Sequence, residues 1–255
     1  MDAHGPASDP PEHAALTYGR YLALDELLGA QRPRSDEHDE MLFIVIHQVY
    51  ELWFKQLLHE LRHLQVRLEA VDTPHAIRTL RRILTILKVA VAQIDVLETM
   101  SPRQFASFRD RLDAASGFQS WQFRELEAIL GRRDAAAGGH YPEGSDARAS
   151  IEAAMDRPSV FDSYLVYLGR QGYPTDDVEA TLLAVYRDDA GPAQLAEHLV
   201  DLDEGVQEWR YRHLKMVERT IGDKPGTGGS AGADYLRTTL SNPVFSALWA
   251  VRSRL

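Results

Sequence analysis

The feature that most constrains this 255-residue chain is a set of three long segments in which apolar side chains recur every three or four residues. The pattern covers residues 40–70, residues 73–94 and residues 192–221. Such spacing places apolar side chains on one face of a helix, and that face must be buried against another element. We therefore predict an all-α, single-domain bundle with long core helices.

Shorter segments between these are delimited by proline, glycine and capping residues, which is typical of short helices. We predict helices at about 17–28, 102–112, 118–130, 146–155, 159–170 and 175–188, with two short ones after residue 232. Residues 1–14 are polar and rich in proline, which predicts a disordered tail before a domain that spans 15–255. Within that domain we expect a surface linker at 132–144 and a mobile glycine-rich loop at 223–232.

The composition excludes several classes of function. A formal net charge of -10 disfavours a nucleic-acid partner, because phosphate recognition needs clustered Lys and Arg. The lack of cysteine excludes disulfides, thiolate catalysis, cysteine-ligated zinc and iron–sulfur clusters. No apolar run reaches membrane-spanning length, and the N-terminal residues lack the apolar core of a signal peptide. We expect a cytoplasmic protein without membrane contact.

One segment, His59 to His63, satisfies the H-E-x-x-H pattern of zinc proteases. Zinc binding would require both imidazoles to face a shared cavity. At about 100° per residue, however, the two histidines lie far from the apolar stripe of residues 43–68. We therefore expect them to face solvent rather than to bind zinc.

The glycine-rich segment 226–232 invites comparison with phosphate-binding loops. It follows a helix rather than a strand and lacks the lysine of a P-loop, so neither nucleotide-binding motif applies. A mobile lid over a binding site and a plain flexible linker both remain compatible with this segment.

His47 and His213 each occupy a position in an apolar stripe where the period predicts a hydrophobic residue. A single histidine in such a place is more often a hydrogen-bonded core residue than a ligand. Two of them on separate long helices, near Trp and Phe side chains and in a chain without cysteine, are compatible with haem ligation by one imidazole. The residue pattern alone leaves both interpretations open.

Several segments of the chain resemble the tryptophan 2,3-dioxygenase family, haem enzymes that open the indole ring. They occur in the family's order, at residues 18–22, 38–55, 105–109, 116–120, 123–124, 212–213, 226–232 and 234–236. The chain departs from the family at Ile46, where relatives often carry a polar residue, and in its short segments between 132 and 190.

The resemblance implies one haem b per subunit, with His213 as the proximal ligand of the iron and Trp209 one helical turn before it. The other residues that match positions lining the haem or its propionates are Ser116, Phe123, Arg124 and Tyr235.

The same resemblance implies a substrate site in which His47 is the distal catalytic residue and accepts a hydrogen bond from the indole N–H. Phe43 and Phe105 would form the walls of the indole pocket. Arg109 would bind the carboxylate of L-tryptophan, for which its planar guanidinium is suited, and Thr227 would contact the ammonium group.

In the family, the N-terminal segment completes the active site of an adjacent subunit. This implies a homotetramer in which Tyr18, Tyr21 and Leu22 reach a neighbour's pocket. The implied activity inserts both atoms of O2 across the indole C2–C3 bond of L-tryptophan and gives N-formyl-L-kynurenine, the first step of tryptophan degradation by the kynurenine route. Two alternatives remain: a related haem oxygenase acting on a modified tryptophan in secondary metabolism, for example by monooxygenation, and a non-catalytic helical oligomerisation protein.

Overall fold

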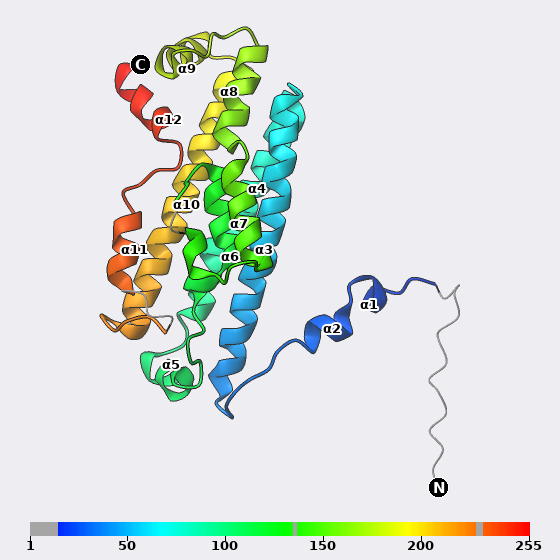
Figure 1. Ribbon diagram of the computed structural model, residues 1–255, viewed down its shortest axis with the longest axis vertical. Helices are drawn as coiled ribbons and strands as arrows, with labels where there is room; N and C mark the ends of the chain where they lie inside the picture. Colours follow the sequence, from blue (N-terminus) through cyan, green and yellow to red (C-terminus); the bar gives the residue numbers. More distant parts are fainter. Residues whose placement is uncertain (1–14, 135–136, 228–231) are drawn as a thin grey trace.

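The computed structural model describes residues 15–134, 137–227 and 232–255. Three long helices dominate it: α3 (His38–Glu69), α4 (Thr73–Leu97) and α10 (Gly191–Ile221), which run side by side along the molecule (Figure 1). Helix α4 packs against both α3 and α10. The described residues contain no β-strand, so the all-α prediction is confirmed.

Local capping explains where the long helices begin and end. The Asp72 side chain accepts a hydrogen bond from the His75 backbone N–H at the start of α4, and Pro74 lies in the first turn. Pro192 occupies the first turn of α10, which ends at Gly222 with a φ of 62°. That left-handed backbone is accessible to glycine, which explains the stop.

The core consists of two clusters of buried apolar side chains. The larger one fills the bundle between α3, α4, α8 and α10 and includes Leu61, Leu80 and Leu199, while the smaller one lies around Ile94 and Phe108. Trp209 and Tyr50, which are partly buried, pack against both clusters. The functional site described below lies at this junction.

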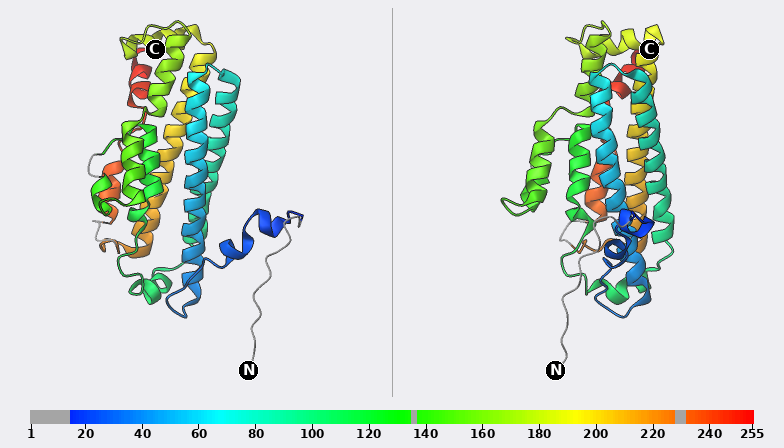
Figure 2. Two further views of the ribbon diagram at one scale, coloured as in Figure 1. Left: turned by 45° about the vertical axis from the view of Figure 1, so that its right-hand side comes forward. Right: turned by 90° about the vertical axis from the view of Figure 1, so that its right-hand side faces the viewer.

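Shorter helices cover the long ones. Helix α6 (Trp121–Leu130) and α8 (Val160–Arg170) pack against α3, and α7 (Asp146–Asp156) packs against α6, as Figure 2 shows from two sides. The others are α1 (Tyr18–Tyr21), α2 (Leu24–Leu28), α5 (Pro102–Arg109), α9 (Val178–Asp188), α11 (Ala233–Thr239) and α12 (Ser246–Ala250), with 3-10 turns at Gly117–Gln119, Ala137–His140 and Val251–Arg254.

The C-terminal segment is fixed on α10 by one buried carboxylate. Asp203, 0% exposed, accepts hydrogen bonds from the backbone N–H groups of Val244 (2.9 Å) and Phe245 (2.8 Å) and from Nε1 of Trp249 (2.9 Å). Hydrogen bonds to a charged acceptor are stronger than neutral ones. Asp203 therefore holds the chain that follows α11 against the core.

Several predicted helices differ from the structure. The helix predicted at 102–112 ends at Arg109, and the one predicted at 175–188 begins at Val178. The segment predicted as one helix at 17–28 is divided into α1 and α2 by Ala23, whose φ is 48°. No residue of either helix is buried, and short helices without packing are marginal. The helix predicted at 118–130 starts instead at Trp121, because the Ser120 side chain caps it by accepting the Phe123 N–H.

Within the described residues, no helix combines the length and apolar character needed to cross a bilayer. The predicted tail, residues 1–14, and residues 228–231 of the predicted mobile loop lie outside the described residues. The domain boundaries, the linker at 132–144 and the loop's mobility therefore stay predictions.

Candidate active site

Residues of α3, α5, α6, α10 and α11 enclose a cavity of about 240 Å³. Its walls combine aromatic rings with two histidines and three arginines that come from distant parts of the sequence. Eleven of the residues singled out in the sequence line it: Phe43, His47, Phe105, Arg109, Ser116, Phe123, Arg124, Trp209, His213, Thr227 and Tyr235. The fold thus brings together both histidines that interrupt the apolar stripes.

The first of these histidines presents one particular nitrogen to its surroundings. Nδ1 of His47 lies 2.7 Å from the carbonyl oxygen of Phe43, one turn earlier in α3. A carbonyl oxygen only accepts, so Nδ1 donates its proton and Nε2 keeps a lone pair. Burial lowers the pKa of His47 and outweighs the opposing effects of this hydrogen bond and of Glu51. His47 is therefore a neutral hydrogen-bond acceptor.

The second histidine is neutral for a similar reason. Burial, and after it the proximity of the His47 imidazole, lowers the pKa of His213 to about 4. The Trp209 ring stacks on the His213 ring with centroids 5.1 Å apart and an angle of 5° between the planes. Trp209 also contacts Phe123, with ring centroids 4.8 Å apart. These contacts fix the orientation of a neutral imidazole, the form that binds a metal.

Aromatic rings form one wall of the cavity next to His47. The Phe43 ring lies 4.1 Å from the His47 ring and 5.6 Å from the Phe105 ring, centroid to centroid. Phe105 in turn packs edge-on against Phe108, with centroids 5.4 Å apart. The wall offers a flat apolar surface of the kind that an aromatic ligand requires.

The start of the glycine-rich loop contacts α5 and the segment that follows it. Arg109 donates a hydrogen bond of 2.6 Å to the carbonyl oxygen of Pro225, and the Thr227 hydroxyl donates one of 2.6 Å to the carbonyl oxygen of Ala115. Arg109 and Thr227, which are predicted to bind the carboxylate and the ammonium group of an amino acid, therefore connect the loop to α5 and to the segment after it.

Arg124 and Tyr235 line another side of the cavity. The Arg124 guanidinium lies over the Phe118 ring, 4.7 Å from its centroid, and the Phe118 ring meets Tyr235 edge-on. Burial alone would lower the pKa of Arg124, but Glu127 and Tyr235 raise it above its ordinary value. Ser116 precedes this group, and its hydroxyl accepts the backbone N–H of Phe118. Arg124 is therefore a firmly charged cation in the cavity wall.

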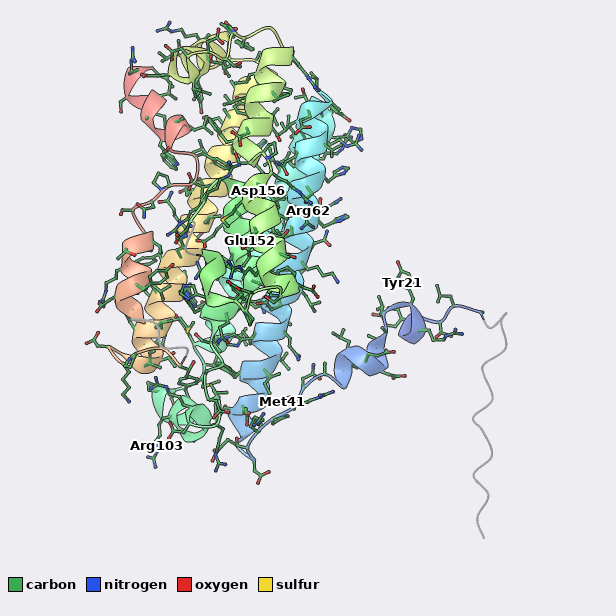
Figure 3. All side chains as sticks on the ribbon, in the orientation of Figure 1. Tyr21, Met41, Arg62, Arg103, Glu152 and Asp156 are labelled. Carbon is green, nitrogen blue, oxygen red and sulfur yellow. The ribbon has the colours of Figure 1, made fainter. Side chains whose placement is uncertain are left out.

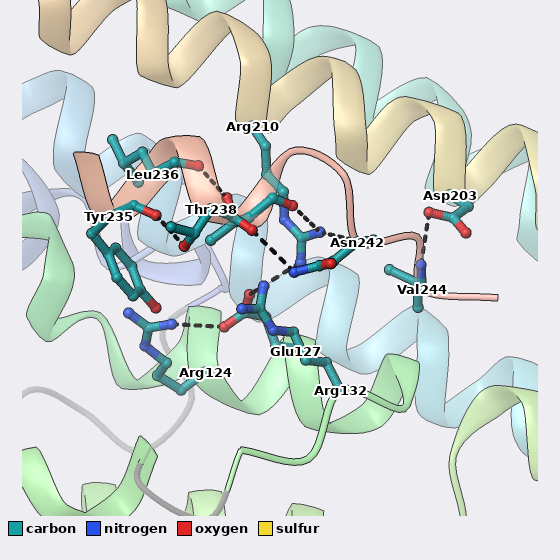
Figure 4. A network of polar contacts seen from close by, with 11 residues as sticks. Arg124, Glu127, Arg132, Asp203, Arg210, Tyr235, Leu236, Thr238, Asn242 and Val244 are labelled. Carbon is teal, nitrogen blue, oxygen red and sulfur yellow. Dashed lines mark hydrogen bonds and ion pairs between the residues drawn. The ribbon is translucent and has the colours of Figure 1, made fainter. Parts of the chain in front are cut away.

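Behind Arg124 lies a network that sequence analysis did not identify (Figure 4). Glu127 accepts hydrogen bonds from Arg124 (2.8 Å), Arg132 (3.2 Å) and Arg210 (3.1 Å). Arg210 also donates to the carbonyl oxygen of Asn242, at 3.1 Å. The network connects α6 to α10 and to the chain that follows α11. Its α10 residue, Arg210, lies three positions before His213.

In the hydrogen bonds of this network, the single carboxylate of Glu127 serves three guanidinium groups. Burial, partly offset by Glu127, lowers the pKa of Arg210, and the nearby charge of Arg132 lowers it further. A buried cation without a full counter-charge is costly, so an anionic ligand beside Arg124 would be favoured. On the sequence, Arg124 and Glu127 resemble an ordinary surface pair at i,i+3 spacing, and nothing indicates that Arg210, 83 residues away, completes the group.

The three N-terminal residues of the predicted site lie outside this cavity. Tyr18 is 75% exposed, Tyr21 72% and Leu22 39%, on a segment that projects away from the bundle (Figure 3). Within one chain these apolar side chains contact no core. Their exposure is compatible with the predicted insertion into a neighbouring subunit, which stays a prediction.

The side chains of the H-E-x-x-H segment do not face a shared metal site. His59 is exposed, whereas the Glu60 carboxylate is buried and accepts hydrogen bonds from Gln56 and Arg82. His63 accepts a hydrogen bond from Arg67 on the same helix. Among the described residues, no group of three or more His, Asp or Glu side chains is arranged to hold a metal ion.

Comparison with known proteins identifies relatives over nearly the whole chain. The model of the family described as tryptophan 2,3-dioxygenase matches residues 2–143 and 143–255. The chain is 63% identical to tryptophan 2,3-dioxygenase of Anaeromyxobacter sp. (strain K), over 97% of this chain and 100% of that protein. It is 52% identical to the enzyme of that name from Herpetosiphon aurantiacus, over 94% of this chain and 99% of that protein. The chain therefore belongs to the tryptophan 2,3-dioxygenase family.

Proposed function

We propose that the protein is a haem-dependent tryptophan 2,3-dioxygenase that inserts both atoms of O2 across the indole C2–C3 bond of L-tryptophan. The product is N-formyl-L-kynurenine, and the reaction is the first step of tryptophan degradation by the kynurenine route. The observation that carries this proposal is the pair His47 and His213, two neutral imidazoles from separate long helices that line one aromatic cavity.

The residues of the cavity suit one haem b per subunit. His213 is neutral and oriented by Trp209, as a proximal iron ligand must be. Phe123 supplies an apolar contact surface, while Ser116, Arg124 and Tyr235 offer polar groups on the same side. The three arginines around Glu127 leave an excess of positive charge, which the two haem propionates would neutralise. When bound, the haem iron would supply the binding and activation of O2 for its reaction with the indole.

The remaining residues of the cavity would hold the substrate. Nε2 of His47 can accept a hydrogen bond from the indole N–H, since its Nδ1 is occupied by the Phe43 carbonyl. Phe43 and Phe105 would contact the faces of the indole. These contacts orient the reacting ring and exclude water from it.

Arg109 and Thr227 would bind the charged ends of the amino acid. The Arg109 guanidinium can form a bidentate pair with the substrate carboxylate in place of its single bond to Pro225. The Thr227 hydroxyl, which now donates to Ala115, can accept a hydrogen bond from the substrate ammonium. Binding would thus exchange contacts between the loop and α5 for contacts with the ligand, which would close the glycine-rich loop over it.

We further propose a homotetramer in which the N-terminal segment of one subunit completes the site of another. Tyr18, Tyr21 and Leu22 would then be the neighbour's contribution to the substrate pocket. Their exposure in the single chain supports this arrangement, because exposed apolar clusters usually mark an interaction surface.

Two measurements test the proposed function. A visible spectrum of the purified protein should show a Soret band, whereas a colourless protein would support a non-catalytic helical oligomerisation role. With L-tryptophan as substrate and 18O2 as the gas, mass spectrometry should show two labelled oxygen atoms in the product. One labelled atom, or turnover only with a modified tryptophan, would assign the protein to a related oxygenase reaction.

A further inference from the structure

A second, smaller cavity lies inside the bundle next to the active site. Its volume is about 40 Å³, and it is enclosed by α3, α4, α6 and α10. Five residues line both cavities and separate them: the rings of Phe54, Phe123 and Trp209 and the charged side chains of Glu127 and Arg210. The aliphatic residues that line only the small cavity include Leu57, Leu61, Ile83, Leu87, Leu202 and Val206.

The small cavity is unsuited to water. Polar side chains at one end belong to Glu127, Arg132 and Arg210, whose charged groups hydrogen-bond to one another. The buried Nε1 of Trp209 has no acceptor at hydrogen-bonding geometry, although Tyr50 lies edge-on beside the ring. The surface of the cavity is almost entirely apolar, whereas a buried water needs two to four polar partners. An apolar guest is therefore favoured.

The small side chain of Ala90 on α4 contributes to the open space. Ala90 contributes only a methyl group to the cavity wall, and Leu87 leans over Gly205, where an added Cβ would lie 2.7 Å from Cδ2 of Leu87. Leu87 thus occupies the room left by the missing side chain of Gly205. Apart from the charged side chains at one end, the void that remains between the helices is lined by buried or partly buried apolar residues.

We propose that this cavity is a docking site for dioxygen. Dioxygen is a small apolar diatomic molecule, and dry apolar cavities in proteins bind apolar gases such as xenon. Where the shared wall is apolar, only the rings of Phe54, Phe123 and Trp209 lie between the cavity and the site. A dioxygen molecule held there could enter the active site when one of the ring side chains changes its rotamer. The cavity would therefore raise the local concentration of dioxygen next to the site. This inference rests on the proposed O2-using function.

The first experiment measures gas binding without turnover. In the purified holoenzyme, 129Xe NMR should show saturable xenon binding, and Ala90→Val should abolish it by filling the cavity. Ala76→Val is the matched control: Ala76 lies on the same helix and is equally buried, at 0% exposure against 1%, but does not line the cavity. Xenon binding that survives Ala90→Val, or that is lost equally in Ala76→Val, would overturn the assignment.

The second experiment links the cavity to the reaction. Ala90→Val should raise the KM for O2 several-fold and leave the KM for L-tryptophan unchanged, because the residue lines only the small cavity. Val206→Ile, which adds a methyl group from α10, should act in the same direction if Ala90→Val folds poorly. Loss of xenon binding without any change in O2 dependence would overturn the docking role.

The two proposals can fail separately. A colourless protein that still binds xenon in a manner sensitive to Ala90→Val would overturn the haem-dependent function and support the apolar-gas site. A red, active enzyme with no saturable xenon binding would support the function and overturn the site.

Discussion

Nδ1 of His47 lies 2.7 Å from the carbonyl oxygen of Phe43, and this contact determines which nitrogen of His47 can meet a ligand. The Phe43 ring simultaneously lies against the His47 ring, with centroids 4.1 Å apart. Backbone and side chain of one residue thus fix both the tautomer and the tilt of the imidazole. The consequence is a preformed acceptor at Nε2.

The substitution His47→Ala removes that acceptor without removing the proposed iron ligand. We expect the variant to retain haem and to lose roughly fivefold in kcat/KM, which corresponds to about 1 kcal/mol for one neutral hydrogen bond. Steady-state kinetics with a ferric absorption spectrum checks this. A change in the resting spectrum from bis-histidine to mono-histidine ligation would instead identify His47 as an iron ligand.

The low pKa of His213 has a consequence for the haem-free protein. Because the folded-state pKa of about 4 lies below the ordinary value of about 6.5, the unfolded chain binds the proton more readily between these two pH values. The free energy of unfolding should therefore be unaffected above pH 6.5 and fall as the pH drops toward 4. Between pH 7 and pH 5 this one group accounts for a loss of about 2 kcal/mol.

Urea denaturation of the haem-free wild type and of His213→Phe, each at pH 7 and pH 5, measures the effect. Phenylalanine keeps the aromatic ring next to Trp209 but cannot titrate, so the pH dependence should be weaker in the variant. Equal slopes in the two proteins would show that His213 is not the group responsible.

Arg109→Ala tests the recognition of the substrate carboxylate. We expect L-tryptophan binding to weaken by about 2–5 kcal/mol, the range for removing one member of a desolvated charge pair. Tryptamine, which lacks the carboxylate, should bind to both proteins with similar affinity. A parallel loss of tryptamine binding would mean that the contact between Arg109 and Pro225 shapes the pocket instead.

Glu127→Gln tests the network behind Arg124. The substitution keeps the size of the side chain but leaves three guanidinium groups without their shared carboxylate, so it should destabilise the protein by about 3–5 kcal/mol. Glu125→Gln is the control, since Glu125 is equally buried on the same helix but pairs with Arg62, whose side chain is 48% exposed. Chemical denaturation of both variants gives the comparison, and equal costs would argue against a special role for Glu127.

The long helices could be predicted from the sequence because their stripes and caps act locally. The predicted segment 40–70 corresponds to α3 at His38–Glu69, and 192–221 corresponds to α10 at Gly191–Ile221. The segment 17–28 could not be predicted correctly, because its apolar spacing has no packing partner in the single chain and Ala23 adopts a left-handed backbone.

The site was predictable only to the extent that family motifs mark it. His47 and His213 interrupt their stripes, which made them visible, but no pattern shows that they face one cavity. The group around Glu127 depends on tertiary contacts between α6 and α10, and the small cavity depends on side-chain volumes across four helices. Such features arise from three-dimensional packing, which periodicity does not encode.

The final prediction concerns the N-terminal segment. Tyr18 and Tyr21 are about three-quarters exposed, and α1 and α2 are too short to be stable without packing, so a second chain is the natural partner. Deleting residues 1–14 should leave activity unchanged, whereas deleting residues 1–24 should reduce it sharply and weaken the oligomer, because each pocket would lose a wall donated by a neighbour. Activity assays combined with light scattering on both deletion variants test this, and an active monomer after the longer deletion would refute the shared site while leaving the haem assignment intact.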